Sequence, residues 1–133
     1  LRHPRQQGVF LGELRLRNCG LSTSGNGEKF FVVDGVRYAH ILDPRTGRPA
    51  ASGLGSVTVV APSATWADAF STGLFVLGAE AGMAKVASLD GVHALFAREA
   101  DGGHADLLVS PGLEASWEPY SAPPQADART ASR

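Results

Sequence analysis

An aspartate and a threonine stand four residues apart in the apolar segment ATWADAFSTGLFVLG, at Asp68 and Thr72. In a helix this spacing places the two side chains on one face, one turn apart. A carboxylate and a hydroxyl are hard oxygen ligands, which suit Mg²⁺ or Ca²⁺ rather than zinc. Because Mg²⁺ commonly keeps water ligands and accepts phosphate oxygens from its substrate, two protein ligands can begin such a site. The pair therefore indicates a candidate magnesium site.

A purely structural explanation of the same residues is also open. Thr65 and Asp68 have the spacing of a capping box, in which the carboxylate secures the N-terminus of the helix. Thr72 could likewise bond back to the backbone one turn earlier. The residues that follow, LFVLG, indicate that the helix is covered on more than one side, and a carboxylate on a covered helix needs a partner such as a cation. The spacing alone does not choose between these explanations.

The segment YAHILDPRTGRPA, residues 38–50, is the second place where the side chains suit chemistry. Histidine is the commonest general acid or base in enzymes, which makes His40, at the end of a strand, a candidate; a histidine bonded to its own loop is the alternative. Ordinary turn chemistry explains three of the residues that follow, Asp43, Pro44 and Gly47. It leaves Arg45 and Thr46, like His40, unexplained.

The hydropathy pattern predicts the elements that must hold these residues. Alternating or β-branched runs predict strands, an Asp-Gly pair predicts a hairpin turn, and apolar residues every three to four positions predict helices. The expected order is a strand within residues 8–20, a short strand running into a turn within 20–27, a hairpin of 30–33 and 36–42, a buried strand at 56–62, helices at 63–78 and 79–91, and a strand pair around 101–103. This order indicates an α+β fold, with a mostly antiparallel sheet and two helices packed on one face.

The first of these helices should face the core with large apolar side chains. Four of them recur at helical spacing: Trp66, Phe70, Leu74 and Leu77. Such a stripe is typical of the buried side of an amphipathic helix, and Gly78 is a natural stop after it. On the same helical wheel, Asp68 and Thr72 lie on the opposite side.

The composition is that of a folded globular domain. The chain has 133 residues, of which 44% are hydrophobic and 19% charged, and its net charge of −1 argues against a general nucleic-acid binder. No apolar run reaches the length that a membrane span needs. Residues 1–48 carry eight Arg or Lys against four Asp or Glu, a positive region that suits a phosphate-bearing ligand or is simply solvated. We expect one domain over residues 1–118 and a disordered polar tail over 119–133.

Taken together, these motifs resemble a known family. The stretches STSGNGEKFFVVDGVRYAHILDPRTGRPA and SVTVVAPSATWADAFSTGLFVLGAEAG are similar, in order and spacing, to the C-terminal half of the FAD:protein FMN transferases, the ApbE family. The similarity covers about residues 2–112. It implies an ApbE-like, T-fold-like C-terminal portion, in agreement with the α+β prediction from the hydropathy pattern.

The resemblance also implies an activity and a set of site residues. Enzymes of this family use Mg²⁺ to transfer FMN from FAD to a threonine hydroxyl of a target protein, with release of AMP. By resemblance, Asp68 and Thr72 would bind the metal, His40 would assist proton transfer and contact FAD, and Leu42 would line the FAD site. The alternative is a non-catalytic module that binds a flavin nucleotide or completes a partner.

Family members carry an N-terminal portion that this chain does not match. The chain begins at Leu1 rather than at methionine, which suggests a fragment or a truncated gene product. We therefore expect association with a missing N-terminal portion or with further copies of the chain, besides an acceptor flavoprotein that offers the target threonine. The resemblance further implies the cell envelope, on the periplasmic side of a bacterial inner membrane, while no membrane span is expected within the chain.

Overall fold

A four-stranded antiparallel sheet forms the centre of the molecule in a computed structural model that describes residues 1–27, 30–99 and 105–120. Its strand order is β2 (Gly20–Gly25), β7 (Leu54–Ala61), β8 (His93–Glu99) and β9 (Ala105–Val109). All three neighbouring pairs are antiparallel. Strand β7 is central and buried along its whole length, as its β-branched sequence predicts, and it ends immediately before Pro62, which cannot continue the ladder.

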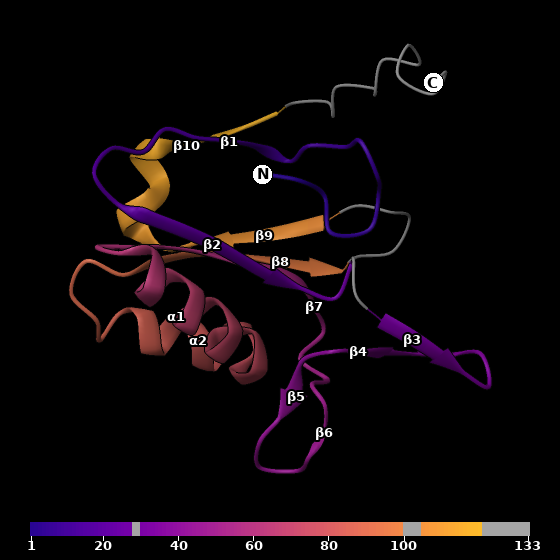
Figure 1. Cartoon of the computed structure of the whole chain (residues 1–133). Helices are drawn as coiled ribbons and strands as arrows, with labels where there is room; N and C mark the ends of the chain where they lie inside the picture. Colours follow the sequence, from indigo (N-terminus) through magenta and orange to yellow (C-terminus); the bar gives the residue numbers. More distant parts are fainter. Residues whose placement is uncertain (28–29, 100–104, 121–133) are drawn as a thin grey trace.

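Two helices cover one face of this sheet, as Figure 1 shows. They are α1 (Ala64–Leu77) and α2 (Ala79–Val86), and Gly78 at φ 83° separates them. The helices and the sheet enclose the main hydrophobic core, to which β7 contributes Val57 and Val59 and β8 contributes Phe96. The predicted α+β architecture, with two helices on one face of a mostly antiparallel sheet, is therefore confirmed.

The opposite face of the sheet carries a smaller second core. Strand β1 (Gly12–Leu14) pairs with β10 (Trp117–Pro119), and a 3₁₀ helix, η2 (Pro111–Ser116), precedes β10. Val60, Leu95 and Leu113 form the buried centre of this core. Pro119 pairs with Gly12, and the Tyr120 N–H donates to the carbonyl of Leu11 at 3.0 Å. The remainder of the predicted tail, residues 121–133, lies outside the described residues.

Two small hairpins extend from the region between β2 and β7 (Figure 1). The first joins β3 (Phe30–Val33) to β4 (Val36–Ala39), and the second joins β5 (Leu42–Asp43) to β6 (Arg48–Pro49). The predicted turn of the first hairpin is confirmed, since Asp34 and Gly35 both adopt positive φ, at 50° and 77°. This left-handed geometry matches the twist of the paired strands.

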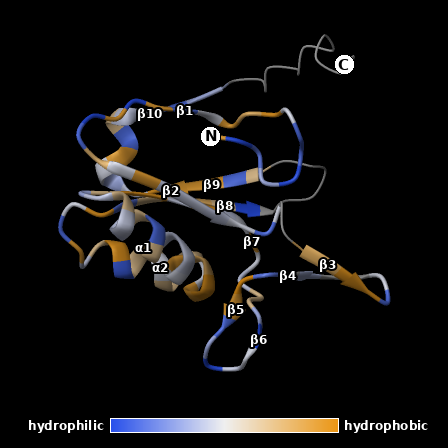
Figure 2. Cartoon of the chain, in the orientation of Figure 1, coloured by the Kyte–Doolittle hydropathy of each residue, from blue (hydrophilic) through white to orange (hydrophobic). Residues whose placement is uncertain are grey.

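Strand β3 is apolar on both of its sides and remains exposed. Its four residues have exposed fractions of 46–57%, and Figure 2 shows hydrophobic colour along β3 in the arm that projects from the body of the molecule. Phe31 stacks on Tyr38 of the paired strand, with ring centroids 5.3 Å apart. A two-stranded hairpin is only marginally stable in water, so this arm is the part of the described structure that most lacks a covering layer.

The prediction for the buried side of α1 is wrong in part. Of the expected stripe only Leu74 is fully buried, while Trp66 and Leu77 have exposed fractions of 55% and 43%. The residues that face the core are Ala67, Ser71, Leu74 and Phe75. Strand β2 lies close to the helix, so small side chains occupy the contact and the larger ones remain outside. Trp66 packs instead against Phe70, with ring centroids 5.5 Å apart.

The strand expected within residues 8–20 is also shorter than predicted, since β1 covers three residues there. In the part of the chain that the structure describes, no helix has both the length and the apolar character required to cross a bilayer. The turn expected at 101–103 falls outside the described residues, although the strands before and after it, β8 and β9, pair as predicted.

Candidate active site

The face of β2 that meets α1 carries only small residues. Gly20, Ser22 and Ser24 alternate along the strand, so they share one side of it. A Cβ atom at Gly20 would overlap the backbone of Ser63 and Ala64 at the start of the helix. The absence of a side chain at Gly20 therefore lets the helix approach closely enough for the two serines to reach helical side chains.

Hydrogen bonds join these two serines to the predicted metal ligands. The Ser22 hydroxyl donates to Oδ1 of Asp68 at 2.9 Å. The Ser24 hydroxyl lies 2.9 Å from Oγ1 of Thr72 and 2.9 Å from Oγ of Ser71. Asp68 and Thr72 are therefore brought together on the β2 side of α1, in a cluster of five polar side chains that we call the hydroxyl cluster: Ser22, Ser24, Asp68, Ser71 and Thr72.

Asp68 does not cap the helix, so the capping-box alternative is wrong. The N-cap is Ser63, whose hydroxyl accepts from the Trp66 N–H. Thr65 lies inside the first turn, and Asp68 bonds a neighbouring strand instead. The predicted back-bond of Thr72 is present only as a long contact, 3.5 Å from the carbonyl oxygen of Asp68. The structural explanation therefore does not account for the carboxylate of Asp68.

The donor set of the hydroxyl cluster fits a hard cation. Asp68 is exposed, and within the described residues its Oδ2 accepts no hydrogen bond, so one carboxylate oxygen is open. The other members supply only hydroxyl oxygens, with no sulfur or imidazole, which is the chemistry of Mg²⁺ rather than of zinc. No group of three or more His, Cys, Asp or Glu occurs in the described parts of the chain. A cation here would depend on water or ligand phosphate for its remaining contacts.

The predicted residues His40 and Leu42 lie elsewhere, at the corner between β4 and β5. Ile41, between them, is buried in the main core and anchors the corner. His40 is exposed, and Leu42 is exposed by 54%. No hydrogen bond between this corner and the hydroxyl cluster occurs in the described structure. The two parts of the predicted site are thus held by separate elements.

The turn after this corner explains two residues that sequence reasoning left open. The carboxylate of Asp43 accepts from the Arg45 backbone N–H at 2.9 Å and from the Arg45 guanidinium at 2.7–3.2 Å. Oγ1 of Thr46 accepts from the Arg48 N–H at 3.2 Å. Arg45 and Thr46 therefore stabilise the turn.

Arg45 also shifts the titration of Asp43. Its side-chain hydrogen bond, then its backbone N–H, and then its charge hold the pKa of the Asp43 carboxyl below its ordinary value. Because the ionised form is favoured in the folded chain, the contribution to stability is complete above the unfolded-state pKa. It is lost as the pH falls through the lower, folded-state value.

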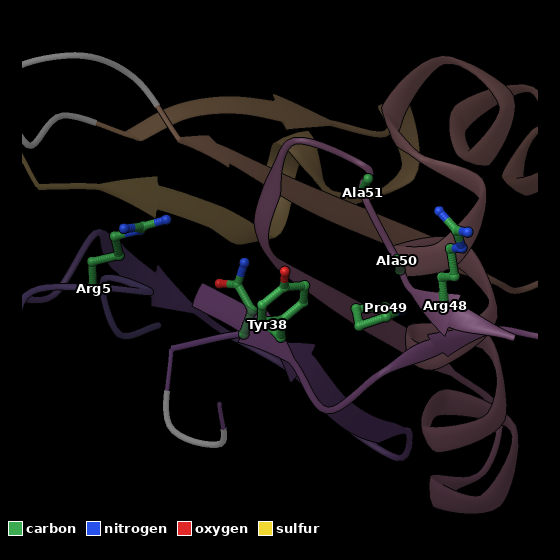
Figure 3. A pocket seen from close by; sticks show the side chains of 7 residues that line it. Arg5, Tyr38, Arg48, Pro49, Ala50 and Ala51 are labelled. Atoms are coloured by element: carbon green, nitrogen blue, oxygen red, sulfur yellow. The ribbon is translucent and has the colours of Figure 1, made fainter. Parts of the chain in front are cut away.

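An open pocket of about 570 Å³ lies beside this turn. Its lining residues are Arg5, Asn26, Tyr38, Arg48, Pro49, Ala50 and Ala51. Figure 3 shows the side chains of Arg5 and Arg48 on opposite sides of the Tyr38 ring. Two guanidinium groups flanking an aromatic ring and an apolar floor suit a ligand that combines phosphate with a planar ring system.

The four predicted site residues, His40, Leu42, Asp68 and Thr72, are not among the described residues that line this pocket. Sequence reasoning did not choose these lining residues, although Tyr38 and Arg48 lie in the segment 38–50 that it identified. The positive balance of residues 1–48 was a signal toward Arg5 and Arg48. Strand β2 connects the two places, because Ser24 belongs to the hydroxyl cluster and Asn26 lines the pocket. At about 3.3 Å per extended residue, these two positions are roughly 7 Å apart.

The sequence from the first residue into strand β8 matches a family model. The model is that of the ApbE family, and the match spans residues 1–96. This chain belongs to the ApbE family. Two curated relatives are named FAD:protein FMN transferase. The one from Treponema pallidum is 51% identical over 81 residues, and the one from Vibrio cholerae is 46% identical over 100 residues.

Solved ApbE structures have the same fold. The ApbE protein of Thermotoga maritima superposes with a TM-score of 0.63 at 41% identity. The match covers 74% of this chain and 31% of the Thermotoga chain. The flavinyl transferase ApbE of Pseudomonas stutzeri gives 0.65 at 36% identity, with 78% and 32% covered. The curated relatives match over 61% and 75% of this chain but over only 22% and 28% of their own length. This ApbE chain thus spans less than a third of the relatives it matches.

Proposed function

We propose that this chain is part of an FAD:protein FMN transferase, which moves FMN from FAD to a threonine hydroxyl of an acceptor flavoprotein and releases AMP. The observation that carries the proposal is the hydroxyl cluster. It holds Asp68 and Thr72 one turn apart with a carboxylate oxygen open, in a chain of the ApbE family. Phosphoryl transfer depends mainly on positioning and on neutralising charge, and a rigid pair of oxygen ligands suits that task.

Asp68 and Thr72 would hold Mg²⁺, since their oxygens fit a hard cation. When bound there, the ion would neutralise charge on the pyrophosphate of FAD. The protein residues position the two metal ligands. Ser22 fixes one oxygen of Asp68, and the other oxygen is left for the cation. The close contact of α1 with β2 keeps both ligands at a constant separation before the substrate arrives, which avoids reorganisation during the reaction.

His40 would act as the general base. In the transfer, the bond between the FMN phosphorus and the bridging oxygen breaks, and a bond forms from that phosphorus to the threonine oxygen. His40 accepts the proton that the threonine hydroxyl loses, and AMP leaves with the bridging oxygen. The exposure of His40 supports this role, because an acceptor side chain must reach it from outside.

The pocket beside the second hairpin would receive the nucleotide. Arg5 and Arg48 offer positive charge for phosphate, and Tyr38 offers a ring for stacking. Leu42 supports the same assignment, because it pairs with the lining residue Pro49 and has an exposed apolar side chain for a flavin ring.

The test of the proposed function is a transfer assay on this chain. It is incubated with FAD, Mg²⁺ and a threonine-containing acceptor protein, and the acceptor is then weighed by mass spectrometry. We expect an FMN adduct on threonine and release of AMP. The His40→Ala variant should form the adduct roughly 100-fold more slowly, the usual loss for a general base. FAD binding without any adduct would favour the alternative of a non-catalytic flavin-nucleotide-binding module.

We also propose that the chain associates through strand β3, either with the N-terminal portion of an ApbE domain or with its own copies. Exposed apolar edge strands associate readily in water, and all four side chains of β3 are exposed. For the isolated chain we expect sedimentation as a species larger than a monomer. Val32→Lys should return it to the monomer by placing a charge on the strand. A monomeric wild-type chain would exclude self-association and leave the N-terminal portion as the partner.

A further inference from the structure

The buried serine of the hydroxyl cluster has no role in the proposed function so far. Ser71 has an exposed fraction of 0%, so it touches neither solvent nor ligand. Its hydroxyl donates to the carbonyl oxygen of Asp68 at 2.9 Å. A carbonyl oxygen only accepts, and a serine hydroxyl has one proton. The proton of Ser71 is therefore committed, and its oxygen can only accept from its second neighbour.

That second neighbour is Ser24, whose oxygen lies 2.9 Å away. Since Ser71 must accept, Ser24 must donate its single proton to Ser71. Ser24 also lies 2.9 Å from Oγ1 of Thr72, and it has no proton left for this bond. Thr72 is therefore the donor to Ser24. Its only other acceptor in the described structure, the Asp68 carbonyl, lies farther away at 3.5 Å.

We propose that Ser71, through Ser24, is a positioning residue that turns the hydroxyl proton of Thr72 inward and leaves the lone pairs of its oxygen open to a cation. The hydroxyls form a one-way chain from Thr72 to Ser24 to Ser71 to the Asp68 carbonyl. A hydroxyl that ligates a cation must direct its proton elsewhere, so this chain prepares Thr72 as a ligand in advance. The inference rests on the proposed function, because it concerns the same cation.

The inference predicts that Ser71, which cannot touch the cation, affects how tightly the cation binds. In Ser71→Ala the proton of Ser24 loses its acceptor and can turn toward Thr72, which then accepts a hydrogen bond and loses a lone pair. We expect the affinity for Mn²⁺, a paramagnetic substitute for Mg²⁺, to be roughly three- to tenfold weaker, the usual size of one misdirected hydrogen bond. The readout is line broadening of the α1 amide signals during Mn²⁺ titration of the ¹⁵N-labelled chain.

The double variant distinguishes this mechanism from a change in packing. Ser24 is the side chain that bonds both Ser71 and Thr72, so in a Ser24→Ala background the further change Ser71→Ala should not alter Mn²⁺ affinity. Thr23→Val is the matched control, because the Thr23 hydroxyl bonds Thr58 at 2.8 Å, away from α1. Its Mn²⁺ affinity should equal that of the wild type. Amide spectra and melting temperatures show that each variant is folded.

Two results would overturn the inference while leaving the proposed function intact. One is a Ser71→Ala chain that binds Mn²⁺ as tightly as the wild type. The other is an equal loss from Ser71→Ala in the wild-type and the Ser24→Ala backgrounds, which would assign the effect to packing of α1. A wild-type chain that shows no broadening at all would overturn the metal assignment of the proposed function, and this inference with it.

Discussion

Replacing Asp68 by alanine is expected to abolish the effect of Mg²⁺ on FAD binding that the proposed function requires. Asp68 supplies the only carboxylate of the hydroxyl cluster, and its Oδ2 is the oxygen that the described structure leaves open. The remaining hydroxyls carry no charge, so a divalent cation would lose its main attraction. We expect FAD affinity in the presence of Mg²⁺ to fall by about 100-fold, to the value without Mg²⁺, because loss of a ligand costs at least as much as loss of its supporting residues.

The measurement is the quenching of flavin fluorescence on titration with the chain, with Mg²⁺ and with EDTA. Asp68→Asn separates charge from shape, because its amide oxygen can still accept from Ser22 but carries no charge; it should behave like the alanine variant. Asp90→Ala removes an exposed carboxylate after α2 and should leave the magnesium effect intact. If Asp68→Ala keeps the wild-type response to Mg²⁺, the metal is bound by other residues.

Replacing Gly20 by alanine should cause the largest loss of stability among changes in the site region. The added Cβ would meet the backbone of Ser63 and Ala64, which cannot rotate away as a side chain can. Helix α1 must therefore move away from β2, and this movement disturbs its packing in the main core. We expect the free energy of unfolding to fall by about 3 kcal/mol, the upper part of the usual range for overpacking, as measured by urea denaturation.

The matched control for this change is Gly73→Ala on the same helix. A Cβ at Gly73 would meet nothing within 4 Å, so the substitution should raise the stability by about 1 kcal/mol, the gain expected for alanine over glycine inside a helix. Gly20→Ala should also weaken Mn²⁺ binding, since it separates Ser22 from Asp68. An equal stability for the two variants would show that α1 does not depend on its close contact with β2.

The elements of the sheet and the helices could be predicted because their patterns are local. Strand β7 is a continuous β-branched run, and the turn of the first hairpin has the Asp-Gly pair that its left-handed geometry requires. The buried side of α1 could not be predicted in the same way. Its contacts are set by β2, which has no side chain at Gly20, and this close approach favours Ala67 and Ser71 over large apolar residues.

The candidate site could be proposed from sequence only where its residues lie on one element. Asp68 and Thr72 share a helix, so their spacing was informative. Ser22 and Ser24 bond to them across 46 and 48 positions of sequence, and no pattern in a single sequence records such a contact. The pocket is similar, because Arg5 and Arg48 come from distant segments and line one pocket only in the folded chain.

The region between β2 and β7 has a further consequence for how the family site can vary. Gly25 pairs with Ser56, and the Asn26 N–H donates to the Gly55 carbonyl at 3.1 Å, so the segment that contains both hairpins leaves the sheet and returns at the same point. The segment is therefore a loop whose two ends lie side by side. The entropic cost of closing such a loop grows only with the logarithm of its length. Insertions or deletions in the hairpins should therefore be tolerated at low energetic cost. The turns at the ends of the hairpins, away from the buried Ile41, can thus change in length while the hydroxyl cluster, held by β2 and α1, keeps its geometry.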